Sequence, residues 1–156
     1  IIRKSSQGYY IRIYRNNSLN STAIWHVITT LEINNRMGNR WIYHLSRKDD
    51  WVASKSSDFY DGSVEDSIDG YLHFSTAKQV EASANKHRKG EKNLLLLEVD
   101  TKKLKNSDLR WEHARQGELF PHIYGSLDKL AVTRVFDLPI NNEGKHVFPL
   151  LKDENL

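Results

Sequence analysis

Hydrophobic and polar residues alternate in several short segments between residues 41 and 138, which is the pattern of β-strands with two different faces. In the first segment Trp41, Tyr43 and Leu45 share one face, and Ile42 and His44 share the other. Alternation, or an unbroken hydrophobic run, predicts five strands in this region: 41–45, 71–75, 94–99, 109–114 and 131–138.

Two short helices are expected between these strands. Ser46 precedes Asp49 at the spacing of a capping box, which predicts a helix start directly after the first strand. Thr76 and Gln79 have the same spacing and predict a second helix, which runs to about residue 88 and stops at Gly90.

The remaining segments are expected to be loops and turns. The stretch 58–69 is rich in acidic and turn-forming residues, and 120–125 combines aromatic residues with a proline and a glycine. We therefore expect a surface loop and an aromatic turn, with Gly70 and Gly125 at positive φ. Four consecutive leucines at 94–97 indicate a central strand that is buried on both faces.

These elements predict one small α+β domain over residues 41–138. The chain has 156 residues, which fits a single domain with two flanking segments. Residues 139–156 begin with a proline and are expected to form a C-terminal tail. Residues 1–40 are expected to be an N-terminal extension with little functional content. Three interpretations of it remain open: translation upstream of a native start at Met37, a basic targeting peptide, or an extra element that packs on the domain.

The basic character of the chain is confined to its first segment. The formal net charge is +3, but residues 1–40 contribute +5 (six basic and one acidic) and residues 41–156 contribute −2 (17 basic and 19 acidic). A nucleic-acid-binding surface requires positive charge on the folded domain. No nucleic-acid partner is therefore expected.

Several classes of protein are not indicated by the composition. Cysteine is absent, which excludes disulfides, thiolate zinc sites and a cysteine nucleophile and suits a reducing, cytoplasmic compartment. No run of about 18 apolar residues occurs, so no membrane-spanning helix is expected. The chain also lacks the G-x-S-x-G nucleophile elbow and a glycine-rich phosphate loop.

Four polar residues lie opposite the bulky faces of their predicted strands: His44, His73, Ser75 and Glu112. If the bulky faces pack on the core, strand alternation brings these four residues to one side of the sheet, where they would line a polar cleft. Each also has an ordinary structural explanation, such as a half-buried strand histidine, a serine cap, or a surface ion pair worth ~0–1 kcal/mol. Their joint placement favours a site.

Several segments resemble, in order and spacing, the bacterial family called domain of unknown function 952. The likeness covers residues 41–138, and its most specific strings are Gly-x-x-His-x-Ser-Thr at 70–76 and Phe-Pro-His-x-Tyr-Gly at 120–125. Members of this family resemble, in fold, the ADP-ribosyltransferases and the RNA 2′-phosphotransferases. The resemblance implies a small, mixed, split sheet with two short helices, whose cleft binds NAD or an ADP-ribosylated substrate.

The resemblance also implies roles for individual residues. His44 matches by position a strand histidine that holds a ribose hydroxyl, and Glu112 or Glu118 would anchor the nicotinamide ribose, where a carboxylate stabilises the positive charge that develops as the bond to nicotinamide breaks. The aromatic residue that stacks on nicotinamide would be Tyr71, Phe120 or Tyr124. The catalytic candidates are thus His44 and Glu112, and the ligand-binding candidates are His73, Ser75, His122 and Tyr124.

The expected function is that of a cytosolic domain whose cleft binds NAD or an ADP-ribose-like nucleotide, with ADP-ribosyl transfer as the more specific form. NAD is the candidate ligand, and no metal is expected. A non-catalytic binding module would use the same cleft without a catalytic carboxylate. A metal-dependent hydrolase would use His44, His73, His122 and Glu112 as ligands, but the sequence lacks H-x-x-x-H or H-x-H spacing.

Overall fold

The computed structural model describes residues 2–4, 10–12, 39–105, 108–114 and 117–153, which belong to two units. In the first unit, Ile1–Gly38, strand β1 (Ile2–Lys4) pairs with the antiparallel strand β2 (Tyr10–Arg12). Met37, the native start in one of the three interpretations of this segment, lies outside the described residues. The second unit, Asn39–Leu156, carries all of the candidate site residues.

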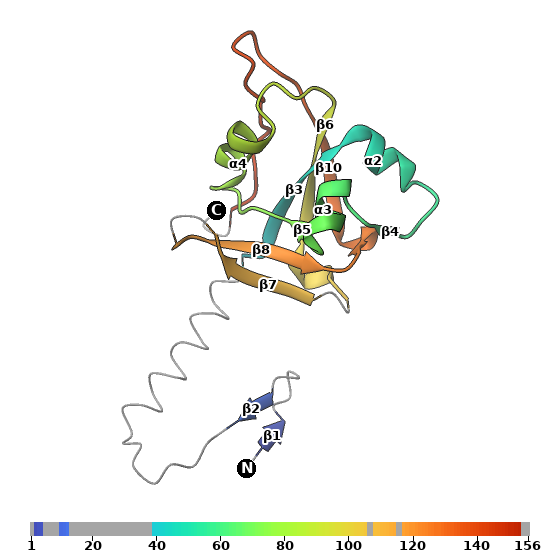
Figure 1. Cartoon of the computed structure of the whole chain (residues 1–156), viewed down its shortest axis with the longest axis vertical. Coiled ribbons are helices and arrows are strands. Elements are labelled where there is room, and N and C mark those ends of the chain that lie inside the picture. Colours follow the sequence, from blue (N-terminus) through green and yellow to red (C-terminus); the bar gives the residue numbers. More distant parts are fainter. Residues whose placement is uncertain (1, 5–9, 13–38, 106–107, 115–116, 154–156) are drawn as a thin grey trace. The chain divides into compact units, whose positions relative to one another are not determined.

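The central sheet of the second unit has three antiparallel strands in the order β10-β6-β3 (Figure 1). These strands are β3 (Trp41–Arg47), β6 (Leu94–Asp100) and β10 (Val132–Leu138). Every residue of β6 is buried. The prediction of a central strand with two covered faces is therefore confirmed.

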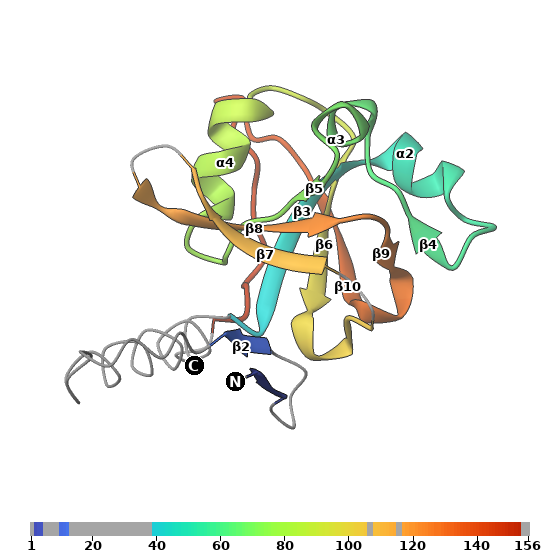
Figure 2. The ribbon, with the colours of Figure 1, turned by 60° about the horizontal axis from the view of Figure 1, so that its bottom comes forward.

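A second antiparallel sheet has the order β5-β8-β7, and Figure 2 shows β7 and β8 lying across the strands of the central sheet. Its strands are β5 (Leu72–His73), β7 (Asp108–His113) and β8 (Leu119–Tyr124). The segment 72–75 belongs to both sheets, because β5 pairs with β8 while Ser75 and Tyr43 exchange backbone hydrogen bonds of 2.9 and 2.8 Å. With the helices below, this confirms the mixed α+β class.

Short helices and a small strand pair complete the described part of the second unit. The helices are α2 (Lys48–Ala53), α3 (Val64–Asp69) and α4 (Val80–His87), with 3₁₀ turns η1 (Thr101–Lys103) and η3 (Lys129–Ala131). Strand β4 (Phe59–Tyr60) pairs with β9 (Leu127–Asp128). The predicted second helix is present as α4, and the Gln79 side chain accepts a hydrogen bond from Thr76 N–H at 3.1 Å ahead of its first turn.

The acidic stretch 58–69 is not the surface loop that its composition predicts, because it contains β4 and α3. Ser63 and Asp66 form a capping box: the Ser63 hydroxyl accepts from Asp66 N–H at 3.2 Å, and the Asp66 carboxylate accepts from Ser63 N–H at 2.9 Å. Gly70 ends the helix at φ +83°, which confirms the positive φ predicted for it. The Ser63–Asp66 spacing is the sequence signal for this helix.

Two other local predictions are wrong. Ser46 does not cap a helix, because β3 continues to Arg47 and the Ser46 hydroxyl lies buried, 2.7 Å from Tyr60 Oη. The segment 120–125 is not a turn, because its residues up to Tyr124 belong to β8. Pro121 takes part in the strand through its carbonyl group, which accepts from Phe74 N–H at 2.9 Å, so its missing N–H does not end the strand.

A hydrophobic core lies between the two sheets. Leu109 and Trp111 of β7 pack against it, so the inward faces assigned to β5 and β7 from alternation are confirmed. The buried residues of this core come from both sheets, from the β4–β9 pair and from η3: Ile42, Tyr60, Leu72, Phe74, Leu95, Leu97, Val99, Ile123, Leu127 and Ala131.

The opposite face of the central sheet is covered by α4 and by the C-terminal segment. Tyr43 belongs to a second buried cluster on this side, against which Phe148 and Leu151 pack. The Tyr43 hydroxyl donates to the carbonyl of Lys152 at 3.0 Å. Residues 139–153 therefore pack on the domain and do not trail from it as the predicted tail would.

Gly62 lies at a position where no side chain fits. Its φ is +83°, and a Cβ there would lie 2.2 Å from Leu72 Cδ2 and 2.8 Å from Asp66 Oδ2.

We expect Gly62→Ala to lower the free energy of unfolding by about 2–4 kcal/mol, through the positive φ and through overpacking. Urea unfolding measures this loss. Gly70→Ala is the matched control, because Gly70 has the same φ of +83° with nothing within 4 Å; equal losses in both variants would contradict the clash.

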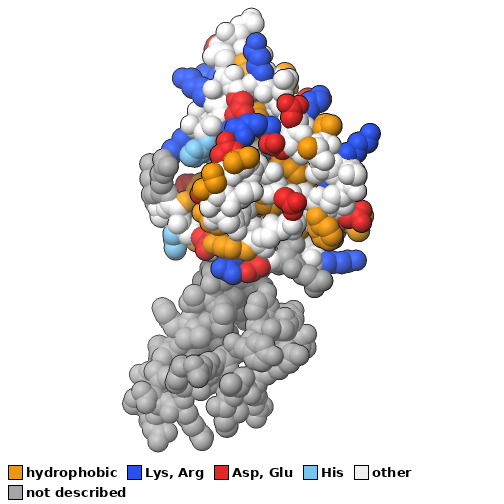
Figure 3. Space-filling model, turned by 45° about the vertical axis from the view of Figure 1, so that its right-hand side comes forward, with side chains coloured by type: hydrophobic (Ala, Val, Ile, Leu, Met, Phe, Trp, Pro, Cys, Tyr) orange, Lys and Arg blue, Asp and Glu red, His pale blue; other side chains and the backbone are white. Residues whose placement is uncertain are grey.

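The charged side chains of the second unit are interspersed. On the face drawn in Figure 3, Lys and Arg side chains alternate with Asp and Glu side chains and with hydrophobic ones. In the described part of the chain, no helix has the length and apolar character to cross a bilayer.

Candidate functional site

The outer face of the second sheet carries a cluster of rings and one carboxylate, which we call the ring face: Tyr71, His73, Glu112, His122 and Tyr124. The Tyr71 ring centroid lies 4.4 Å from that of His122 and 5.1 Å from that of Tyr124. The His73 and His122 centroids are 5.4 Å apart. The structure thus brings together four of the predicted site residues, with Tyr71 against three of them.

Glu112 is the carboxylate of the ring face, and its side chain is 37% exposed. One oxygen accepts a hydrogen bond from His122 Nδ1 at 2.7 Å, and the Tyr124 hydroxyl lies 3.2 and 3.1 Å from the two oxygens. The bond from His122, with a smaller contribution from Tyr124, outweighs burial and lowers the pKa of Glu112 below its ordinary value. Glu112 is therefore ionised at neutral pH.

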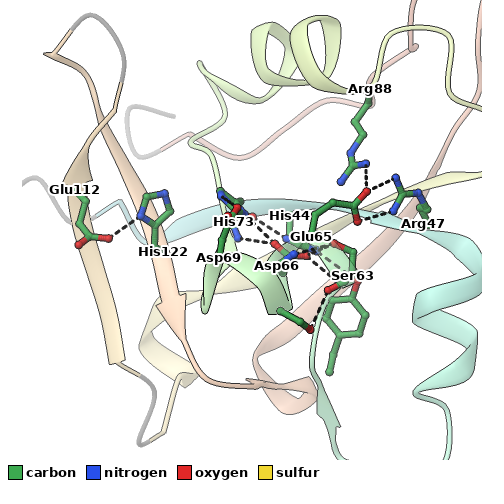
Figure 4. Close-up of polar contacts among 12 residues, drawn as sticks. His44, Arg47, Ser63, Glu65, Asp66, Asp69, His73, Arg88, Glu112 and His122 are labelled. Carbon is green, nitrogen blue, oxygen red and sulfur yellow. Dashed lines mark hydrogen bonds and ion pairs between the residues drawn. The ribbon is translucent and has the colours of Figure 1, made fainter.

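His73 is held by α3 on the side away from Glu112 (Figure 4). Asp66 Oδ1 lies 2.9 Å from His73 Nδ1, and Asp69 Oδ2 lies 3.4 Å from His73 Nε2. Asp66 is buried, and it also accepts hydrogen bonds from the backbone N–H and the hydroxyl of Ser63. Burial alone would raise the pKa of Asp66, but the bonds from His73 and Ser63 and the attraction of His44 hold it well below its usual range.

His44 does not belong to the ring face, and the prediction that it shares an open cleft with His73 is wrong. It is 3% exposed and lies in the core between the sheets, with ring centroids 5.2 Å from Phe74 and 5.5 Å from Tyr60. Its Nδ1 lies 2.7 Å from the His73 carbonyl oxygen. The reason is that β3 is covered on both faces, so the face opposite Tyr43 is also interior.

The buried imidazole of His44 predicts a pH dependence of stability. Burial lowers the pKa of His44 below its ordinary value of 6.5, although Asp66 and the His73 carbonyl oppose this. As the pH falls below 6.5, the unfolded chain binds a proton that the folded chain does not bind, so stability is lost. Between pH 7.5 and 5.5 this loss is at most about 1.4 kcal/mol.

Urea unfolding at both pH values in the wild type and in His44→Gln measures this contribution. The variant should lose that part of the pH dependence. An unchanged difference between the two pH values would show that His44 is not its source.

Ser75 and Glu118 also lie away from the ring face. Ser75 is 6% exposed, and its hydroxyl lies 3.0 Å from that of Ser83 on α4. Glu118 is exposed in the turn between β7 and β8. Of the two glutamates that the sequence left open, Glu112 is therefore the one on the ring face. Of the aromatic candidates, Tyr71 and Tyr124 contact each other, and Tyr71 contacts both histidines.

Asp66 and Asp69 are site residues that the sequence pattern did not single out, because the acidic stretch 58–69 resembles a loop. Arg110 lies on the rim of the ring face, with its guanidinium 4.0 Å above the Tyr124 ring and its Nε 3.0 Å from Asp108. Over the ranges that the structure describes, no three His, Asp or Glu side chains are grouped so as to hold a metal ion.

A hollow of about 210 Å³ adjoins the ring face between α3 and the turn that follows β8. Tyr71 belongs to the hollow and to the ring face, because it lines the hollow and contacts the rings of His73, His122 and Tyr124. The other lining residues are Asp61, Asp66, Ser67, Gly70, Leu72, Gly125 and Ser126.

The domain is of the α+β class, and its two small sheets share one extended segment. It carries a polar surface site, in which an ionised glutamate lies among rings on the outer face of one sheet. The chain belongs to the family described as "Protein of unknown function (DUF952)", whose model matches residues 45–135. The family resemblance seen in the sequence is thereby confirmed.

Solved structures of protein CC0527 from Caulobacter crescentus are similar to this chain. The crystal structure is 36% identical, covers 69% of this chain and 93% of that chain, and has a TM-score of 0.64; the crystal structure of a double mutant gives the same values. The solution NMR structure is 37% identical, covers 68% and 90%, and has a TM-score of 0.59. No curated protein sequence matches the chain.

Proposed function

We propose that the ring face binds a nucleotide of the NAD or ADP-ribose type. The observation that carries this proposal is the set of rings around an ionised carboxylate, in which Tyr71 lies against His73, His122 and Tyr124. A planar base can stack on such rings, and imidazole nitrogens can hydrogen bond to ribose hydroxyls. The sequence likeness to proteins that resemble the ADP-ribosyltransferases points to the same class of ligand.

ADP-ribosyl transfer is the more specific form of this proposal. In it the bond between ribose C1′ and the nicotinamide nitrogen breaks, the electron pair leaves with nicotinamide, and an acceptor forms a new bond to C1′ while losing its proton. Positive charge develops on the ribose, and Glu112 is the ionised group that would stabilise it. His44 is then a positioning residue, because it contacts the backbone of His73 and not the ring face.

The contacts of Glu112 also give it a role in binding without catalysis. Both oxygens of Glu112 already lie within hydrogen-bond distance of the Tyr124 hydroxyl, and one of them accepts from His122. A carboxylate held in this way orients the imidazole of His122 whether or not any reaction follows. The transferase and the binding module therefore differ in the consequence of removing the charge of Glu112.

A thermal-shift measurement with NAD, ADP-ribose and ATP tests the binding proposal. A ligand at 100 times its Kd stabilises the folded chain by about 2.7 kcal/mol, which raises Tm by about 5–10 °C. His73→Gln and Tyr71→Leu should each abolish the shift caused by NAD. His113→Gln is the matched control, because His113 is an exposed histidine on β7 outside the ring face. No shift with any of these nucleotides at millimolar concentration would refute nucleotide binding.

Release of nicotinamide from NAD separates the transferase from the binding module. If transfer or hydrolysis occurs, Glu112→Gln should retain the affinity for NAD and lower the rate of release by about 10²–10³. Glu118→Gln should leave the rate unchanged, because Glu118 is exposed in the β7–β8 turn. Binding of NAD with no release in the wild type would support the binding module.

A further inference from the structure

The hollow beside Tyr71 has a negative electrostatic character. Two of its lining residues are aspartates, and among the described residues that line it none is Lys or Arg. Asp66 is ionised, since its pKa lies well below the usual range. Asp61 is exposed at the rim and accepts a hydrogen bond from the Ser126 hydroxyl. Such a hollow disfavours phosphate and carboxylate groups and attracts positive charge.

The size and the walls of the hollow restrict its occupant further. Its volume of about 210 Å³ is below the range of about 300–1,000 Å³ that holds drug-sized ligands, so it has room for one ring system and not for a dinucleotide. Tyr71 provides an aromatic wall, which attracts a cationic ring. The hydroxyls of Ser67 and Ser126 and the carboxylate of Asp61 offer acceptors to a ring substituent that carries N–H groups.

We infer that this hollow takes the base end of the bound nucleotide, in the form of a single positively charged ring. The inference rests on the proposed function, because it names which part of the nucleotide enters the hollow. The phosphate groups then lie on the side of the ring face where Arg110 stacks on Tyr124, away from Asp61 and Asp66. The hollow thus selects a positively charged base, and the ring face contacts the remainder of the nucleotide.

Calorimetric titration of the whole chain with three probes tests this inference. Nicotinamide riboside carries a cationic ring, its dihydro form has an uncharged ring of the same size, and ADP-ribose has no base at that end. We expect nicotinamide riboside to bind about tenfold more tightly than the dihydro form at low salt. The preference should shrink in 0.5 M salt, because the charges at the rim are exposed.

Asp61→Asn should reduce the preference for the cationic ring. Asp58→Asn is the matched control, because Asp58 is an exposed aspartate nearby that does not line the hollow. Ser126→Trp should block the hollow and weaken binding of nicotinamide riboside at least tenfold while leaving Tm unchanged, since Ser126 is exposed.

The possible outcomes separate this inference from the proposed function. Equal affinity for the charged and uncharged rings, or equal losses in Asp61→Asn and Asp58→Asn, would overturn the inference. Binding of ADP-ribose would in that case leave nucleotide binding intact. Binding of none of the three probes would overturn both the inference and the proposed function.

Discussion

Replacing Asp66 with asparagine is expected to lower the free energy of unfolding by about 3–5 kcal/mol. The Asp66 carboxylate is 5% exposed and accepts hydrogen bonds from the Ser63 N–H, the Ser63 hydroxyl, the His73 N–H and the His73 ring. Asparagine has the same size but only one acceptor oxygen, and its NH₂ group would face donors. Urea unfolding at pH 7 measures the loss.

Asp69→Asn is the matched control for this prediction. Asp69 also pairs with His73, but its side chain is 49% exposed and the contact is 3.4 Å, so the expected change is within about 0.5 kcal/mol. Comparable losses of unfolding free energy in Asp66→Asn and Asp69→Asn would mean that the contribution of Asp66 to stability does not depend on its burial. Because Asp66 holds His73 on the ring face, Asp66→Asn should also weaken nucleotide binding.

The second large effect is expected at Glu98, in the centre of β6. Its side chain is 0% exposed and accepts hydrogen bonds from Thr133 at 2.6 Å, from Arg134 Nε at 3.0 Å and from Lys152 Nζ at 3.0 Å. These bonds outweigh burial and lower the pKa of Glu98 to about 2. Glu98→Gln removes the buried anion from Arg134 and Lys152, whose own side chains are 39% and 41% exposed and stay in contact with water. We therefore expect a loss of about 2–4 kcal/mol, which comes from the charge-assisted hydrogen bonds.

Glu143→Gln is the control for Glu98→Gln. Glu143 pairs with Lys145 at 3.0 Å, but its side chain is 70% exposed, so the change should stay within about 0.5 kcal/mol. Since Lys152 lies in the C-terminal segment, Glu98→Gln should also make that segment more sensitive to proteases than the control does. If Glu98→Gln lost the expected stability but its C-terminal segment stayed resistant to proteases, the bond from Lys152 to Glu98 would not be what holds that segment in place.

The sequence predicts most of the strands because alternation is a local property. The central strand is recognisable from its four leucines, and the inward faces of β5 and β7 follow from the positions of Leu72 and Trp111. Strand β8 is missed because Pro121 and Gly125 suggest a turn, although the carbonyl of Pro121 still bonds to Phe74. Helix α3 is missed because its acidic composition conceals the Ser63 cap.

The position of His44 could not be predicted from the strand pattern alone. Alternation shows that His44 and Tyr43 lie on opposite faces of β3, but it does not show whether one or both faces are covered. Two distant segments decide this: Phe148 and Leu151 of the C-terminal segment help to cover the Tyr43 face, and Tyr60 of the unpredicted β4 packs on His44. The contact between Asp66 and His73 was missed for a related reason, because Asp66 reaches His73 only through the fold of α3.

The extended segment 72–75 connects the ring face to backbone hydrogen bonds inside the domain. Its His73 side chain faces outward, while the amides of Ser75 and Tyr43 are bonded to each other's carbonyls inside the domain. We expect a molecule that immobilises His73 to slow the local opening of the backbone at these two amides. Slower hydrogen–deuterium exchange at the amides of Tyr43 and Ser75 would therefore show that a ligand is bound at His73, and the ligand would need no label.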